Sequence, residues 1–228
     1  MDSVDVLMVG NFAKDKIIVD GVEETASGGG VYFGSVVIRR LGHSVAVATR
    51  LHPQDFSRLD ELRQEGVQVF AAAADGTSGI AYYYQSNDME RRICVPIGFG
   101  GKHTLADIPN LAAKVIMVTP LFAGEVDLDL LGTLAARAPL ALDVQGFIRV
   151  PMGDWLHFQP WAEMPAGLAH VTYLKLDRAE AEHLTGLTDL AVAARVLSEM
   201  GPKEIVLTDS AGVRVFAGGE MHFAPFNP

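Results

Sequence analysis

Short apolar runs alternate with amphipathic segments along most of the chain. The apolar runs predict buried strands, at residues 4–9, 16–19, 45–48, 67–70, 115–118, 140–144, 171–174 and 204–208. Segments with apolar residues at helical spacing predict helices, at residues 31–41, 53–65, 128–136, 178–184 and 191–200. This alternation of strand and helix predicts an α/β fold in which helices flank a central, mainly parallel sheet.

Two segments break the alternation and predict β-hairpins. Residues 80–85 and 91–95 are rich in β-forming residues and flank the turn-forming sequence Ser86-Asn87-Asp88, which predicts an exposed hairpin. Residues 212–216 and 220–223 flank Gly218-Gly219 and predict a second hairpin.

Polar residues follow several of the predicted strands. In open parallel sheets the ligand binds outside the carboxyl ends of the strands. The candidate positions for a binding site are therefore Asn11, Asp143, residues 175–177 and residues 208–210.

Asn11 and Asp15 come just after the first predicted strand. A carboxylate accepts two short hydrogen bonds from neighbouring hydroxyls, so this pair is suited to a vicinal diol. The alternative is a turn-forming asparagine and a solvated aspartate. The spacing alone leaves both interpretations open.

Three glycines, Gly28-Gly29-Gly30, precede the predicted helix at residues 31–41. Glycine lets a ligand approach the backbone closely, and free N–H groups at a helix start donate to it. The alternative is a flexible turn in which Ser27 caps the helix. No Gly-Lys-Ser/Thr follows, so the run is not a P-loop, and its spacing does not support a Rossmann-type dehydrogenase.

Two further segments each have two interpretations. Asp177 followed by Glu180 is typical of a capping box, and the same carboxylates are suited to a magnesium–phosphate cluster. The segment from Thr208 to Gly212 either approaches a nucleotide or forms an ordinary turn.

Composition and charge exclude several classes of function. The net charge is −10 and no Lys/Arg cluster is long enough to follow a phosphate backbone, so we expect no nucleic-acid partner. Cys94 is the single cysteine, which excludes an internal disulfide and metal sites built on several cysteines. No apolar run is long enough to span a bilayer and no basic segment precedes one at the N-terminus. We therefore expect a cytoplasmic protein that does not bind membranes.

Read in order, the motifs resemble those of the ribokinase/PfkB carbohydrate kinases over nearly the whole chain. They are Val9-Gly10-Asn11 with Asp15, the glycine run before a helix that ends Arg40-Leu41-Gly42, Leu142-Asp143-Val144-Gln145-Gly146-Phe147, Lys175-Leu176-Asp177-Arg178-Ala179-Glu180-Ala181 with Leu184-Thr185-Gly186, and Ile205-Val206-Leu207-Thr208 with Gly212. The resemblance implies a single ribokinase-like α/β domain over residues 1–228. It also implies a small β lid from about residues 12–25 and 79–97.

The resemblance assigns roles to particular residues. It implies that Asp15, Gly29 and Gly30 hold substrate hydroxyls, with Asn11 and Asp143 as further substrate-binding residues. It implies that Glu180 organises Mg²⁺ through water, that Asp177 stands at a phosphate-binding position where the family has asparagine, and that Thr208 and Gly212 border the nucleotide.

The implied activity is transfer of the γ-phosphoryl group of ATP, with Mg²⁺, to a hydroxyl of a sugar or polyol. The Asp-Val-Gln-Gly-Phe stretch resembles sugar or inositol kinases more than adenosine kinases. Many family members form a homodimer through the lid, and the resemblance allows one here.

One family motif has no counterpart in the sequence. The Gly-x-Gly-Asp motif, which supplies an anion hole and the catalytic base, is expected beyond Pro228, so no catalytic residue is assigned and we expect little or no turnover by residues 1–228. The alternative is a kinase-like module that binds a small polyol or nucleotide without catalysis.

Overall fold

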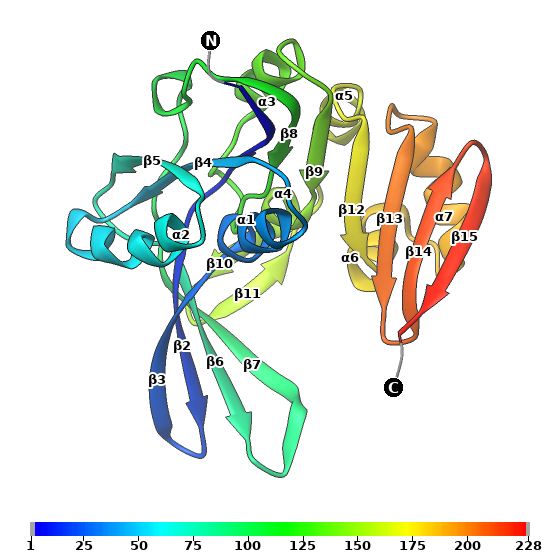
Figure 1. Ribbon diagram of the computed structural model, residues 1–228. Coiled ribbons are helices and arrows are strands. Elements are labelled where there is room, and N and C mark those ends of the chain that lie inside the picture. The colour runs from blue at the N-terminus through cyan, green and yellow to red at the C-terminus, as the bar shows by residue number, and fades with distance from the viewer. Residues whose placement is uncertain (1–2, 227–228) are drawn as a thin grey trace.

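The computed structural model describes residues 3–226, without the side chains of residues 89–91. Its central sheet has nine strands in the order β15-β14-β13-β12-β9-β8-β1-β4-β5 (Figure 1). In chain order these strands are β1 (Ser3–Val9), β4 (Val45–Leu51), β5 (Gln68–Ala73), β8 (Ala112–Val118), β9 (Leu140–Asp143), β12 (Tyr173–Asp177), β13 (Glu204–Asp209), β14 (Gly212–Ala217) and β15 (Glu220–Pro225). The strands from β13 to β5 pair in parallel, and β14 and β15 pair antiparallel. The predicted fold class is confirmed.

Helices cover the two faces of this sheet. On one face, Val31 of α1 (Gly30–Arg40), Leu59 of the 3₁₀ helix Pro53–Leu59 and Leu62 of α2 (Asp60–Gln64) pack against β1 and β4. The opposite face carries the larger core, built with α3 (Leu128–Ala135), α5 (Met164–Leu168), α6 (Arg178–Thr185) and α7 (Leu190–Ser198). Figure 1 shows α6 and α7 behind β12, β13 and β14.

A second sheet of four strands projects from the body of the molecule (Figure 1). Its order is β3-β2-β6-β7, formed by β2 (Ala13–Val19), β3 (Val22–Gly28), β6 (Gly79–Gln85) and β7 (Asp88–Gly98). We call it the small sheet. The hairpin predicted at residues 80–95 is confirmed as the antiparallel pair β6–β7. That the small sheet acts as a lid stays a prediction.

The structure corrects three details of the predicted elements. The helix predicted at residues 53–65 is a 3₁₀ helix followed by the short α2. Phe56 and Leu59, three positions apart, lie in the 3₁₀ helix, whereas Leu62 lies in α2. The strand β3 was not predicted because most of its residues are polar and exposed. The short hairpin of β10 (Arg149–Met152) and β11 (Trp155–Phe158) was not predicted either.

Within residues 3–226, no helix has both the length and the apolar composition needed to cross a membrane.

Candidate active site

Asn11 lies directly after β1, at the carboxyl edge of the central sheet. Its side chain is fully buried, and Nδ2 donates to the carbonyl of Gly101 at 3.0 Å. Its Oδ1 has no hydrogen-bond partner. A buried oxygen without a partner is costly, so this atom is suited to accept a hydrogen bond from a ligand hydroxyl.

Asp15 lies on β2, at the root of the small sheet, and is 7% exposed. Its Oδ1 accepts from the N–H of Ile80 at 2.8 Å. Burial raises the pKa of this carboxyl, and the hydrogen bond from Ile80 opposes the rise. A Cβ added at Gly28 would collide with Oδ2 of Asp15, so only glycine leaves room for the carboxylate there.

Gly29 and Gly30 bring the start of α1 against the carboxyl edge of the sheet. Gly29 has φ 88°, which favours glycine, and a Cβ there would lie 2.9 Å from the carbonyl oxygen of Asn11. A Cβ at Gly30 would collide with the hydroxyl of Thr119. No side chain caps α1. The structure therefore places the start of α1 beside Asn11 and Thr119.

The alternative in which Ser27 caps α1 is wrong. Ser27 lies in β3, and its hydroxyl donates to Oε1 of Glu61 at 2.9 Å. The N-cap residue is Gly29, which has no side chain that could fill the space in front of the helix. The glycine run is therefore a place where the backbone approaches its neighbours closely.

Asp177 and Glu180 form the predicted capping box at the start of α6. Oδ1 of Asp177 accepts from the N–H of Glu180 at 2.8 Å, and Oε2 of Glu180 accepts from the N–H of Asp177 at 2.7 Å. Glu180 is fully buried and its Oε1 has no partner. Burial, with Asp143 and Asp177 nearby, raises the pKa of Glu180 to about 7. One carboxylate oxygen therefore remains for a further ligand.

The magnesium site that the resemblance implies fits these residues. Among residues 3–226 no group of three or more His, Cys, Asp or Glu side chains could hold a metal ion. Mg²⁺ in kinases keeps several waters and takes only one or two protein carboxylates, with substrate phosphates completing its shell. The free Oε1 of Glu180 is suited to such a water-mediated contact, which stays a prediction.

Thr208 and Gly212 lie beside this capping box, at the ends of β13 and β14. Thr208 is the register partner of Asp177, and Gly212 is the register partner of Asp209. An open cavity of about 320 Å³ lies here, lined by Asp177, Arg178, Ala179, Glu182, Thr208, Asp209 and Ser210. None of these side chains is aromatic or large and apolar.

Two arginines meet on one carboxylate at this cavity. Oδ2 of Asp209 lies 2.9 Å from Arg178 and 2.7 Å from Arg214. The two guanidinium groups hold the pKa of Asp209 well below its usual range. The cavity is therefore polar, and its lining combines three carboxylates with one guanidinium group, that of Arg178, which is paired with Asp209.

Asp143 lies between these two groups of residues. It ends β9, and the strand order places β9 between β1 and β8 on one side and β12 and β13 on the other. Its Oδ2 lies 3.0 Å from Nζ of Lys175, and its Oδ1 accepts from the N–H of Gln145 at 3.2 Å. The predicted site residues thus form two clusters along one edge of the sheet, with Asp143 between them.

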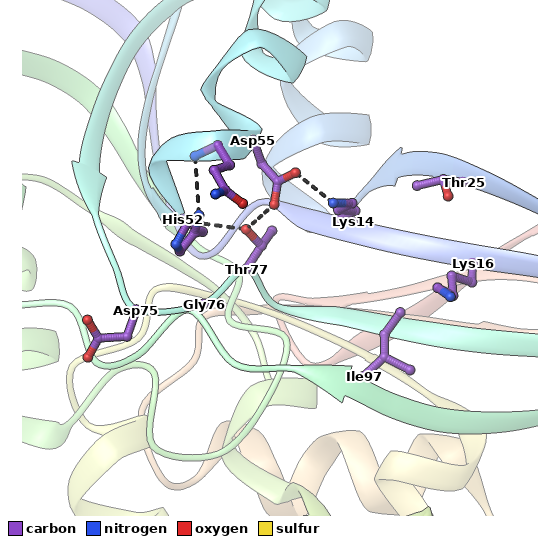
Figure 2. Close-up of a pocket in the computed structure, with 10 residues that line it drawn as sticks. Lys14, Lys16, Thr25, His52, Asp55, Asp75, Gly76, Thr77 and Ile97 are labelled. Carbon is purple, nitrogen blue, oxygen red and sulfur yellow. Dashed lines mark hydrogen bonds and ion pairs between the residues drawn. The ribbon is translucent and has the colours of Figure 1, made fainter.

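A larger open cavity of about 460 Å³ contains none of the predicted site residues (Figure 2). Lys14 and Lys16 line it, and because side chains alternate along a strand they point away from the side of β2 that carries Asp15. Figure 2 shows Asp55 between Lys14 and Thr77. Its carboxylate contacts each of them at 2.7 Å. These contacts join the small sheet to the 3₁₀ helix Pro53–Leu59.

The sequence did not single out a buried polar network beneath Asn11. Glu125 is fully buried, with Oε1 accepting from the Ser78 hydroxyl at 2.9 Å and Oε2 accepting from the N–H of Leu121 at 2.7 Å. The Ser78 hydroxyl also accepts from the N–H of Gly100 at 2.9 Å. Burial raises the pKa of Glu125 to about 7. The only signal in the sequence was its place in the loop after the strand 115–118.

Comparison with known proteins identifies the family of the chain. The sequence profile of the pfkB family carbohydrate kinases matches residues 9–228. The chain belongs to the pfkB family of carbohydrate kinases. No curated protein matches it in sequence.

Several solved structures are similar to the chain. The sulfate complex of a pyrophosphate-dependent kinase in the ribokinase family has 32% identity and a TM-score of 0.91, covering 98% of this chain and 79% of that one. A pyrophosphate-dependent kinase of the same family, complexed with a pyrophosphate analogue and myo-inositol, has 32% identity and a TM-score of 0.89, covering 97% and 78%. The ribokinase of Arabidopsis thaliana, complexed with ribose and ATP, has 17% identity and a TM-score of 0.75, covering 99% and 79%, and shows the fold alone.

Proposed function

We propose that this kinase binds a cyclic polyol of the myo-inositol type as its phosphoryl acceptor. The observation that carries the proposal is the 32% identity, over 97% of the chain, to a kinase that was complexed with myo-inositol. The polar groups at the predicted acceptor end support it. Asp15 offers a carboxylate and Asn11 an unpartnered carbonyl oxygen, and both accept hydrogen bonds from hydroxyl groups.

The proposed arrangement of the acceptor follows from the positions of these groups. One carboxylate binds two neighbouring hydroxyls of a polyol, and the start of α1 at Gly29 and Gly30 supplies backbone donors. The acceptor hydroxyl then faces along the sheet edge toward Asp143 and Asp177. Mg²⁺, when bound near Glu180, neutralises charge on the donor phosphates.

We further propose pyrophosphate as the donor, in place of the ATP that the resemblance implied. Two observations support this choice. The relatives at 32% identity are pyrophosphate-dependent. The described cavity at the predicted donor end is lined by polar side chains and by Arg178, and it offers no aromatic or large apolar side chain to an adenine ring. The described residues thus offer no contact surface for the adenine of a nucleotide, a group that pyrophosphate does not have.

Turnover needs a base that we do not assign within this chain. Residues 1–228 contain no Gly-x-Gly-Asp sequence. We therefore expect residues 1–228 to bind the acceptor and to transfer phosphoryl groups slowly or not at all, because loss of a general base alone lowers a rate by about 10²–10⁴.

We make three further proposals. The first, that the protein works in the cytoplasm, rests on the pattern of the sequence. The other two rest on the resemblance: the small sheet acts as a lid over the acceptor, and two copies pair through the small sheet. The exposed apolar side chains Tyr83 and Ile93 on β6 and β7 support the last of these.

A panel of thermal unfolding measurements tests the acceptor and the donor separately. A ligand that binds only the folded chain raises its melting temperature. We expect myo-inositol to raise it, ribose and adenosine to raise it less, and pyrophosphate with Mg²⁺ to raise it more than ATP with Mg²⁺. A larger effect of ribose or adenosine would contradict the acceptor. If ATP with Mg²⁺ raised the melting temperature more than pyrophosphate with Mg²⁺, ATP would be the better donor, and the proposed acceptor would be unaffected.

A further inference from the structure

Lys175 lies on the line between the two ends of the site. It belongs to β12, and its register partner in β9 is Asp143. Met8, Met117, Ala141 and Tyr173 are successive register partners across β1, β8, β9 and β12, so they share one face of the sheet. Met8 packs on that face with α1. Lys175 is two residues beyond Tyr173 and therefore faces the same side.

The amine of Lys175 forms an ion pair but remains partly exposed to solvent. Its Nζ lies 3.0 Å from Oδ2 of Asp143, and its side chain is 38% exposed. A lysine stem has four flexible carbons and its ammonium carries three donors. Lys175 is therefore able to exchange its partner without a change in the backbone.

Lys175 stands among three carboxylates. The negative charges of Asp143, Glu180 and Asp177 all act on its amine. Arg178, the next cation along the chain, points instead to Asp209 and Glu182, at 2.9 and 3.5 Å. A pyrophosphate that enters this edge adds several negative charges to three that are already there, so it needs a cation that faces it.

We propose that Lys175 is a ligand of the donor phosphate, which it takes up in exchange for Asp143 when the donor binds. This proposal rests on the proposed function. The exchange frees Oδ2 of Asp143 to accept a hydrogen bond from the acceptor polyol. Donor binding should then strengthen acceptor binding, because the movement of Lys175 to the donor leaves Asp143 free to bind the polyol.

Calorimetric titration of pyrophosphate with Mg²⁺ into the 228-residue chain tests this role. Lys175→Met should weaken pyrophosphate binding by about tenfold or more, because a hydrogen bond to a charged group is lost. Lys175→Arg keeps the charge and should stay within about threefold of the unsubstituted chain. Asp143→Asn leaves Lys175 without its present partner, so it should strengthen pyrophosphate binding.

A second titration measures the coupling, which a purely structural role for Lys175 would not produce. Saturating pyrophosphate with Mg²⁺ should raise the affinity of the unsubstituted chain for myo-inositol. Lys175→Met releases Asp143 without any donor, so this variant should bind myo-inositol in the absence of donor at least as tightly as the unsubstituted chain and should show no further increase when the donor is added. Circular dichroism checks that each variant folds. If Lys175→Met does not fold, Asp143→Asn gives the test, since unchanged or weaker pyrophosphate binding by that variant contradicts the exchange.

The outcomes separate this inference from the function on which it rests. Equal pyrophosphate affinity in the unsubstituted chain and Lys175→Met overturns the role of Lys175 while leaving the proposed acceptor intact. No pyrophosphate binding by the unsubstituted chain overturns both Lys175 as a ligand of pyrophosphate and pyrophosphate as the donor. Absence of myo-inositol binding, with pyrophosphate still bound through Lys175, overturns only the acceptor.

Discussion

The hydroxyl of Ser78 donates to Oε1 of Glu125 at 2.9 Å, across 47 positions of the sequence. Ser78 stands just before β6 and its carbonyl accepts from the N–H of Lys14, so it belongs to the root of the small sheet. Glu125 lies in the loop after β8 and belongs to the body. This bond therefore joins the two parts of the molecule beside Asn11.

Glu125→Gln should change how stability depends on pH. Burial raises the pKa of Glu125 from 4.5 to about 7, so the folded chain holds its proton at pH values where the unfolded chain has lost it. The contribution of Glu125 to stability therefore falls as pH rises from 4.5 to about 7, by on the order of 3 kcal/mol at most. Glutamine does not titrate, so the melting temperature of the variant should rise relative to that of the unsubstituted chain across this window.

Thermal unfolding of both chains between pH 4.5 and pH 8 provides the measurement. Glu199→Gln, at the exposed end of α7, is the matched control for replacing a glutamate that the fold does not enclose, and the trend of Glu125→Gln is compared with it. A constant difference between Glu125→Gln and the unsubstituted chain at all these pH values would show that Glu125 does not carry the buried proton.

Glu180→Gln should weaken the effect of Mg²⁺ on donor binding. The variant keeps the hydrogen bond that completes the capping box, but it removes the negative charge that the free Oε1 offers to a hydrated cation. We expect pyrophosphate to bind the variant with about the same affinity with and without Mg²⁺. Glu199→Gln, at the exposed end of α7 and outside the cavity, should leave the Mg²⁺ effect as it is. An unchanged Mg²⁺ effect in Glu180→Gln would remove Glu180 from the proposed metal site.

Gly30→Ala should reduce both stability and acceptor binding. The added Cβ would collide with the Thr119 hydroxyl, which is nearly fully buried and cannot move freely. Overpacking of this kind costs about 1–3 kcal/mol. Gly132→Ala in α3 is the comparison, because its Cβ would meet only the His170 ring at 3.3 Å. Equal melting temperatures for the two variants would contradict the close approach at Gly30.

Much of the fold follows from local patterns in the sequence. Each buried strand is a short apolar run and most helices show helical spacing, so the parallel sheet and its flanking helices were predictable. The hairpin of β10 and β11 was not, since each strand has only four residues and Pro151 lies within the first of them. The helical spacing over residues 53–65 predicts a helix but does not distinguish the 3₁₀ helix Pro53–Leu59 from the α-helix α2 that follows it.

The candidate site was predictable where it depends on strand ends and on motifs. Asp15, the glycines and the pair Asp177 and Glu180 are examples. Contacts set by the strand order were not predictable. The pair Asp143 and Lys175 forms because β9 lies beside β12, and Ser78 meets Glu125 because the small sheet returns to the body there. The spacing of apolar and polar residues along the chain does not indicate which strands will lie side by side.

Calorimetric titration of myo-inositol into the 228-residue chain and its Asp15→Asn variant tests the central claim most directly. The substitution keeps the size of the side chain but removes the charge that accepts two hydroxyl groups, which should weaken binding by about tenfold or more. Glu24→Gln, on the exposed face of β3, is the control and should bind as the unsubstituted chain does. Saturable binding that is lost in Asp15→Asn alone is the predicted result. No binding by the unsubstituted chain, or equal binding by Asp15→Asn, would contradict the account.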